Sequence, residues 1–144
     1  DIGGVNSNVR EYSIGMLYRN GNVKPTLLAY QTAAKMLDAA EFEKKWKSGN
    51  CSKGYIFTKP DGSRVALLWD RTDGYGLNQK KTEFAGQEPW IAFWKTRTPV
   101  RLKCTGTEIK VINPIGQLRR IPAKNGYAEV NLSGEPIWVV GAEF

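Results

Sequence analysis

From residue 42 onward, apolar and polar residues alternate with a period of two, which is typical of half-buried β-strands. Runs of strand-forming residues recur about every ten residues, with turn residues such as Gly, Pro and Asn between them. We therefore predict a mostly β fold, an antiparallel β-sandwich of about eight or nine strands. The predicted strands are 42–47, 55–58, 64–69, 90–94, 100–104, 108–112, 117–121, 127–132 and 137–140.

The stretch 55–70 is predicted to be a central hairpin, because Pro60-Asp61-Gly62 separates two strand-forming runs. Its second arm is apolar on both faces, with Val65, Leu67 and Trp69 on one face and Ala66 and Leu68 on the other. Such a strand belongs in the middle of a sheet that has another layer packed on it. We predict that Trp69, and Trp138 in another apolar strand, are core residues.

Residues 25–40 are predicted to form one helix, which begins at Pro25. Its apolar stripe consists of Leu27, Tyr30, Ala34 and Leu37, widened by Ala33 and Ala40. The most economical partner for this stripe is the sheet, so we expect the helix to pack on it. The predicted organisation is a segment 1–41, with a loop, a short strand ending in an Asn-Gly turn and the helix, followed by a sandwich domain 42–144.

The composition excludes much active-site chemistry. The chain has no His, so it cannot hold a Ser-His-Asp triad or a His-ligated zinc, and two Cys cannot supply four thiolates. Cys51 and Cys104 either form one disulfide or leave Cys104 as a small buried hydrophobe. Asp70 and Asp73, before Gly74, offer oxygens of the kind that calcium takes, but the spacing lacks the full calcium-loop pattern, so we predict no cofactor.

Charge and hydropathy limit the classes of partner that the chain can bind. The 144 residues include 21 Lys and Arg against 14 Asp and Glu, a net charge of +7, which indicates either a polyanionic partner or simply a basic surface. A nucleic-acid-binding β-fold is one alternative, but no basic stripe is interleaved with the aromatic residues. No apolar run approaches the roughly 18 residues of a membrane span, so we expect no membrane partner.

Two stretches carry a resemblance to glycoside hydrolases. The first, Gly15-Met16-Leu17-Tyr18-Arg19-Asn20-Gly21-Asn22-Val23-Lys24-Pro25 and on to Phe42, resembles the last segment and helix of a (β/α)8 barrel of that class, with Asn20 where the family has Asp. The second comprises 65–69, 109–116 and 132–141, and is similar to the C-terminal β-sandwich that follows such barrels. The resemblance implies an accessory, non-catalytic domain, a parent catalytic barrel and secretion. No position matches the family's two catalytic carboxylates, so none is carried over. The chain begins at Asp1 without an initiator Met, so we expect a processed or excised piece.

Carbohydrate sites pair aromatic rings, on which sugars stack, with planar polar side chains. Trp90 and Trp94 share one strand face and would form an outward ledge if Ile91 and Phe93 face the core; the reverse orientation is equally open. Tyr75, in a long polar loop, either binds sugar or plugs the loop. The predicted carbohydrate-binding residues are Trp90, Trp94, Tyr75, Asp70, Arg71, Asp73, Asn78, Gln79 and Trp46, of which Trp46 is undecided between surface and core.

The leading hypothesis from the sequence is a non-catalytic accessory domain that binds a β-linked polysaccharide or oligosaccharide, of xylan or glucan type, through these residues. The alternative is a structural domain that braces its parent barrel through the helix and touches no sugar.

Overall fold

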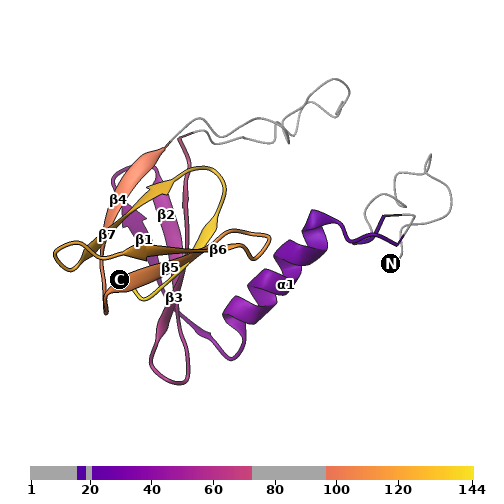
Figure 1. The fold of residues 1–144 in the computed structure, drawn as a ribbon, viewed down its shortest axis with the longest axis horizontal. Coiled ribbons are helices and arrows are strands. Elements are labelled where there is room, and N and C mark those ends of the chain that lie inside the picture. The colour runs from indigo at the N-terminus through magenta and orange to yellow at the C-terminus, as the bar shows by residue number, and fades with distance from the viewer. Residues whose placement is uncertain (1–15, 19–20, 73–96) are drawn as a thin grey trace.

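A computed structural model describes residues 16–18, 21–72 and 97–144 (Figure 1). One helix and eight strands lie within these residues, and all eight strands coincide with predicted ones; the predicted strand 90–94 lies outside the described residues. The elements are α1 (Pro25–Leu37), β1 (Glu41–Ser48), β2 (Ser52–Thr58), β3 (Arg64–Asp70), β4 (Thr98–Lys103), β5 (Glu108–Ile112), β6 (Leu118–Pro122), β7 (Tyr127–Leu132) and β8 (Ile137–Val140). The mostly β fold class is therefore confirmed.

The strands form two antiparallel sheets. The six-stranded sheet has the order β1-β2-β3-β8-β5-β6, and β4 pairs with β7 in a two-stranded sheet. The hairpin β2–β3 forms as predicted, with Gly62 at a φ of 78° in its turn. Strand β3 lies inside the six-stranded sheet, between β2 and β8, which confirms its central position.

The core lies between the two sheets, on what we call the inner face of the six-stranded sheet. Buried side chains from both sheets pack into one cluster, to which β4 and β7 contribute every second residue. Its larger members are Ile56, Leu68, Ile109, Val111, Val139, Val100, Leu102, Val130 and Leu132. Cys104 belongs to the cluster, and both cysteines are free, so the buried-hydrophobe alternative is confirmed for Cys104.

The opposite, outer face of the six-stranded sheet is covered less evenly. Trp138 lies on this face and is only 5% exposed, as predicted for a buried residue. Trp69 also lies on this face but is only half-buried, so the prediction that it is a core residue is wrong. The two-residue period placed it opposite Leu68 correctly, but the two-stranded sheet covers only the inner face.

Helix α1 lies beside the outer face (Figure 1). Thr32 is the one helical residue that is buried, and it meets the β5–β6 turn closely, since a Cβ added to Gly116 would stand 3.1 Å from its Oγ1. The predicted stripe is oriented differently: Tyr30, Ala34 and Leu37 are exposed. The prediction that the sheet covers this stripe is wrong, because the helix turns another side, with Thr32 and Met36, towards the sheet. No helix in the described part of the chain is long and apolar enough to cross a membrane.

A β-bulge in β1 changes the faces predicted for that strand. The register shifts between Phe42 and Lys44, so that Phe42 pairs with Phe57 on the outer face while Trp46 pairs with Gly54 on the inner face. Phe42 and Trp46, which strict alternation places together, therefore point to opposite sides. Trp46 packs against the core cluster.

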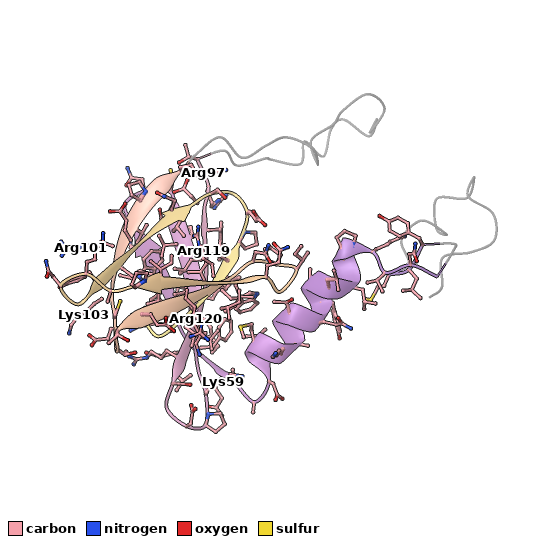
Figure 2. The ribbon with its side chains drawn as sticks, viewed as in Figure 1. Lys59, Arg97, Arg101, Lys103, Arg119 and Arg120 are labelled. Carbon is pink, nitrogen blue, oxygen red and sulfur yellow. The ribbon has the colours of Figure 1, made fainter. Side chains whose placement is uncertain are left out.

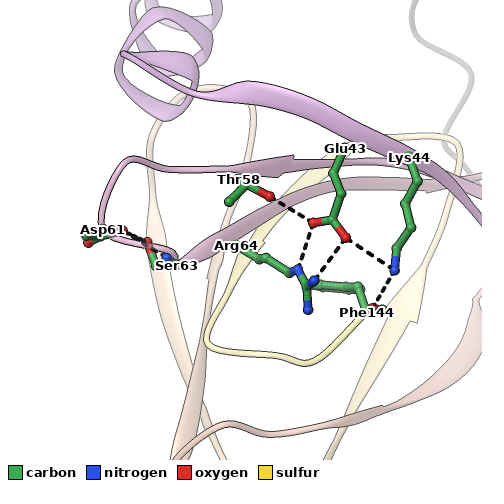
Figure 3. A network of polar contacts seen from close by, with 7 residues as sticks. All are labelled: Glu43, Lys44, Thr58, Asp61, Ser63, Arg64 and Phe144. Atoms are coloured by element: carbon green, nitrogen blue, oxygen red, sulfur yellow. Dashed lines mark hydrogen bonds and ion pairs between the residues drawn. The ribbon is translucent and has the colours of Figure 1, made fainter.

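The bulge residue, Glu43, anchors a polar network that ties β1 to β3 and to the end of the chain (Figure 3). Its carboxylate accepts two hydrogen bonds from Arg64, at 2.7 and 2.9 Å, and one from Thr58 at 2.8 Å. Lys44 donates to the backbone carbonyl of Phe144 at 2.8 Å. The hydrogen bonds from Arg64 and Thr58 lower the pKa of Glu43 from 4.5 to about 2.

We expect Gly54→Ala to destabilise the fold by about 1–3 kcal/mol, because overpacking of a filled site costs this much. An added Cβ would stand 2.4 Å from Leu68 Cδ2 and 2.7 Å from the Leu67 carbonyl oxygen. Urea unfolding measures the change. Gly106→Ala is the matched control, since its Cβ would meet nothing within 4 Å. Equal free energies of unfolding for the two variants would contradict the close packing of β2 on β3.

The Glu43 network should make stability depend on acid pH. Because the folded-state pKa lies below the ordinary value of 4.5, the stabilisation is present at neutral pH and is lost as the pH falls from about 4.5 towards 2. Glu43→Gln should therefore flatten the fall in thermal midpoint over this range. Glu135→Gln, at an exposed turn position, serves as the control and should leave the slope as in the wild type. An unchanged slope in the Glu43 variant would refute the network's role.

Candidate functional site

The structure describes three of the nine carbohydrate-binding residues predicted from the sequence, Asp70, Arg71 and Trp46. Trp90, Trp94, Tyr75, Asp73, Asn78 and Gln79 lie outside the described residues, so their role stays a prediction. Arg71 is exposed just after β3, and Trp46 is half-buried on the inner face. The structure therefore does not bring Trp46 together with Arg71 as one surface.

Asp70 is 1% exposed and has partners of its own within the fold. Its carboxylate accepts hydrogen bonds from the Ser52 hydroxyl at 2.9 Å and from the Thr72 backbone N–H at 2.8 Å. Burial raises the pKa of Asp70, but hydrogen bonds from Thr72, Ser52 and Thr98 outweigh this effect, and the pKa lies below its ordinary value. These contacts connect the first residue of β2 to the last residue of β3, so the carboxylate of Asp70 stabilises this end of the hairpin. A role of Asp70 in sugar binding stays a prediction.

Four aromatic rings form a continuous row on the outer face of β1, β2 and β3, and we call them the aromatic row. Phe42 lies edge-on to Phe57 and to Tyr55, with ring centroids 6.0 and 6.1 Å apart, and Tyr55 lies 5.3 Å from Trp69. Phe42 is 57% exposed and Tyr55 39%. Sequence analysis missed this row because the bulge moved Phe42 to the outer face, although the alternation of Tyr55, Ile56 and Phe57 already placed two rings there.

Nearly all the large exposed hydrophobic side chains of the described residues lie on α1 or on the outer face. We call this surface the helix-side face. Among the large hydrophobic side chains that are exposed, all but Tyr127 lie on α1 or the segment just before it, on the outer face, or in the β5–β6 turn beside α1. They are Met16, Tyr18, Val23, Leu28, Tyr30, Leu37, Phe42, Tyr55, Ile115 and Leu118. Tyr30, at 63%, is the most exposed of them.

The contact between α1 and the sheet is incomplete. A cleft of about 540 Å³ remains between them, lined mainly by apolar side chains that include Leu28 and Met36 from the helix and Ile112 and Leu118 from the sheet. The backbone carbonyl of Asp38, just after the helix, accepts a hydrogen bond from Lys59 in the β2–β3 turn, which fixes the end of α1. The helix is therefore held at that end, while its apolar outer stripe has no cover from the described residues.

The helix-side face is suited to association and carries no evident catalytic constellation. Within 16–18, 21–72 and 97–144, no three His, Cys, Asp or Glu side chains stand close enough to hold a metal ion. The ionisable groups with a lowered pKa, Glu43, Asp61 and Asp70, are accounted for by hydrogen bonds to their neighbours within the fold. The chemistry that this surface offers is apolar contact, edged by lysines.

Comparison with known proteins identifies a fold likeness. No family model and no curated protein matches the chain. Among solved structures, a family 39 glycoside hydrolase from the gut symbiont Bacteroides cellulosilyticus WH2 matches with a TM-score of 0.62 and 21% identity, covering 97% of this chain and 24% of that one. The chain thus spans about a quarter of the length of that hydrolase. The match agrees with the expected resemblance at the level of fold.

A second solved structure, a noncanonic maltogenic alpha-amylase AmyB from Thermotoga neapolitana, is similar with a TM-score of 0.42 and 13% identity over 80% of this chain and 23% of that chain.

Replacing Asp70 with Ala should lower the free energy of unfolding by about 1–3 kcal/mol, because the buried Ser52 hydroxyl and the Thr72 N–H lose their acceptor. Asp70→Asn keeps one oxygen acceptor and should cost less. Chemical denaturation of both variants measures this order. If Asp70→Ala were as stable as the wild type, the bracing role would be refuted.

Proposed function

We propose that this chain is a non-catalytic accessory domain of a secreted, glycan-hydrolysing enzyme, and that it braces the catalytic barrel by packing its helix-side face against it. The observation that carries the proposal is the uneven distribution of exposed apolar side chains, which gather on α1 and the outer face. Large exposed apolar patches are rare on monomeric soluble proteins, and they commonly mark a surface that another protein or domain covers.

The fold likeness supports the proposal in a coarser way. The matched region makes up only a quarter of the family 39 hydrolase, as expected for one domain among several. In addition, the part of the chain that precedes the sandwich resembles the end of a barrel, so a barrel would lie next to α1. The apolar stripe with Tyr30 and Leu37 then faces the position where the barrel's neighbouring elements would pack.

Polysaccharide binding is a second candidate function, and the aromatic row is the observation that favours it. Its half-exposed rings offer flat apolar area to sugar rings, and Lys45, Lys47 and Lys53 stand around it on the same face of the sheet. A β-linked glycan of xylan or glucan type would lie along the row. Because the row belongs to the helix-side face, barrel packing and glycan binding compete for one surface, and a single labelling experiment separates them.

Hydroxyl-radical footprinting of the 144-residue chain and of the full-length protein that contains it tests the proposal. We expect Tyr30 and Phe42 to be labelled readily in the isolated chain and to be protected in the full-length protein, because the barrel covers them. Tyr127, an exposed tyrosine on the two-stranded sheet, is the matched control and should be labelled equally in both.

Equal labelling of Tyr30 and Phe42 in the two proteins would contradict docking of the helix-side face. Protection of Tyr55 by added xylan or β-glucan, with no protection by the remainder of the protein, would favour the second function instead.

A further inference from the structure

A groove on the other side of the molecule has features that barrel packing does not use. It lies between the two-stranded sheet and the edge of β6, has a volume of about 610 Å³, and is lined by both polar and apolar side chains. Ile121, Pro122 and Ala128 supply the apolar part. The polar part consists of Arg101, Glu129, Lys124 and Asn125, with the Tyr127 ring beside them.

The strand period places the key side chains in this groove. On β4, Val100 and Leu102 point into the core, so Arg101 between them points outward. On β7, Ala128 and Val130 are buried, and Tyr127 and Glu129 point outward for the same reason. Because β4 pairs with β7 in antiparallel register, these outward side chains lie next to each other.

The guanidinium of Arg101 is held in position by an aromatic ring. Its Cζ stands 4.1 Å from the centroid of the Tyr127 ring, a cation–π contact. Tyr127 is itself fixed by a two-residue turn: Asn125 and Gly126 have φ of 52° and 78°, and the backbones of Lys124 and Tyr127 exchange hydrogen bonds of 2.7 and 3.1 Å. The groove is therefore organised before any ligand arrives.

Arg101 forms no ion pair within the described part of the chain. Its neighbours differ: Lys103 pairs with Glu143 at 2.7 Å, and Arg120 pairs with Glu108. Arg101 makes no ion pair there, not even with its cross-strand partner Glu129, and Lys124 makes none either. Figure 2 shows Arg101 and Lys103 projecting from this side of the sandwich. A preorganised planar donor without a carboxylate partner is the arrangement that recognises a ligand carboxylate through two parallel hydrogen bonds.

We propose that this groove binds an acidic glycan, that is, a saccharide whose units carry carboxylates. Arg101 would take the carboxylate, Lys124 and Asn125 would donate to it or to ring oxygens, and Glu129 would accept from hydroxyls, while the apolar floor contacts the C–H faces of the sugar. The choice of a saccharide as the bearer of the carboxylate rests on the proposed function, whereas the preference for a carboxylate rests on the groove alone.

Calorimetric titration of the 144-residue chain with polygalacturonate, and with the same polymer fully methyl-esterified, tests the proposal. The ester keeps the sugar backbone and removes the charge. We expect the acid form to bind and the ester to bind at least about tenfold more weakly, because the ester cannot form a charge-assisted bidentate pair. Arg101→Gln should weaken binding of the acid form by about tenfold or more.

Lys103→Gln is the matched control, since it removes the same charge from the same strand outside the groove, and it should change the affinity by less than about twofold. Circular dichroism melts should confirm that both variants fold, as expected for exposed side chains. The proposal is overturned if the chain does not bind polygalacturonate, if the ester binds as well as the acid, or if the two variants weaken binding equally. Equal affinity for single-stranded DNA would also overturn it, because general attraction of polyanions would then explain the result.

The test is independent of barrel docking. The groove is lined by β4, β7 and the end of β6 and shares no residue with the exposed apolar side chains of the helix-side face, so protection of Tyr30 in the full-length protein and binding of polygalacturonate by the isolated chain can each fail alone.

Discussion

The two faces of the six-stranded sheet are covered unequally, and this inequality decides which side chains of the domain are buried and which remain exposed. The inner face is closed by β4 and β7, whose alternating side chains complete a buried core with Ile56, Leu68 and Val139. Among the described residues, α1 alone lies beside the outer face, and this helix buries a single residue, Thr32. Burial of apolar area drives association as it drives folding, so the open part of the outer face is where a further domain can add stability.

The two layers of the sandwich therefore expose different kinds of side chain. On the helix-side face, large apolar side chains such as Tyr30 and Phe42 are exposed next to a partly filled cleft, a surface suited to protein contact. On the two-stranded sheet, the outward positions carry Arg101, Tyr127 and Glu129, which suit a polar ligand. Both surfaces follow from the two-residue period of the strands. Each sheet turns every second side chain towards the core, and the side chains between them point away from it.

Much of the fold could be predicted from the sequence because a two-residue period and turn signals are local. The Pro60-Asp61-Gly62 turn and the apolar alternation of β3 both act within a few residues, and the eight strands predicted from residue 42 onward within the described residues are all present. The short strand predicted in segment 1–41 is represented, in the described residues, only by an isolated bridge between Leu17 and Val23. It is harder to predict on which face of the sheet a side chain lies and whether that face is covered. The bulge after Phe42 depends on pairing with β2, and the exposure of Trp69 depends on which face the second sheet covers, so neither follows from the residues nearby.

The candidate functional residues also depend on contacts between strands that are distant in the sequence. Asp70 is predicted from the sequence as a sugar-binding residue, and that role stays a prediction. Its bracing contact with Ser52 could not be predicted locally, because Ser52 is eighteen residues away in the sequence and only the pairing of β2 with β3 brings the two side chains together. The stripe on α1 is apolar as predicted, but the helix turns Thr32 and Met36 towards the sheet and leaves Tyr30 exposed, and the pattern along the helix alone does not specify this orientation. The groove around Arg101 needs three strands that are distant in sequence, so no local pattern indicates it.

Hydrogen–deuterium exchange of the isolated 144-residue chain can show whether α1 needs further cover, because it measures how firmly each element is held by the chain itself. We expect amides of β3 and β8, covered on the inner face, to exchange slowest and amides of α1 to exchange far faster, since the helix lacks most of its cover. Protection of α1 equal to that of β3 would show that the helix is already fully packed, and would contradict the claim that another domain completes this face.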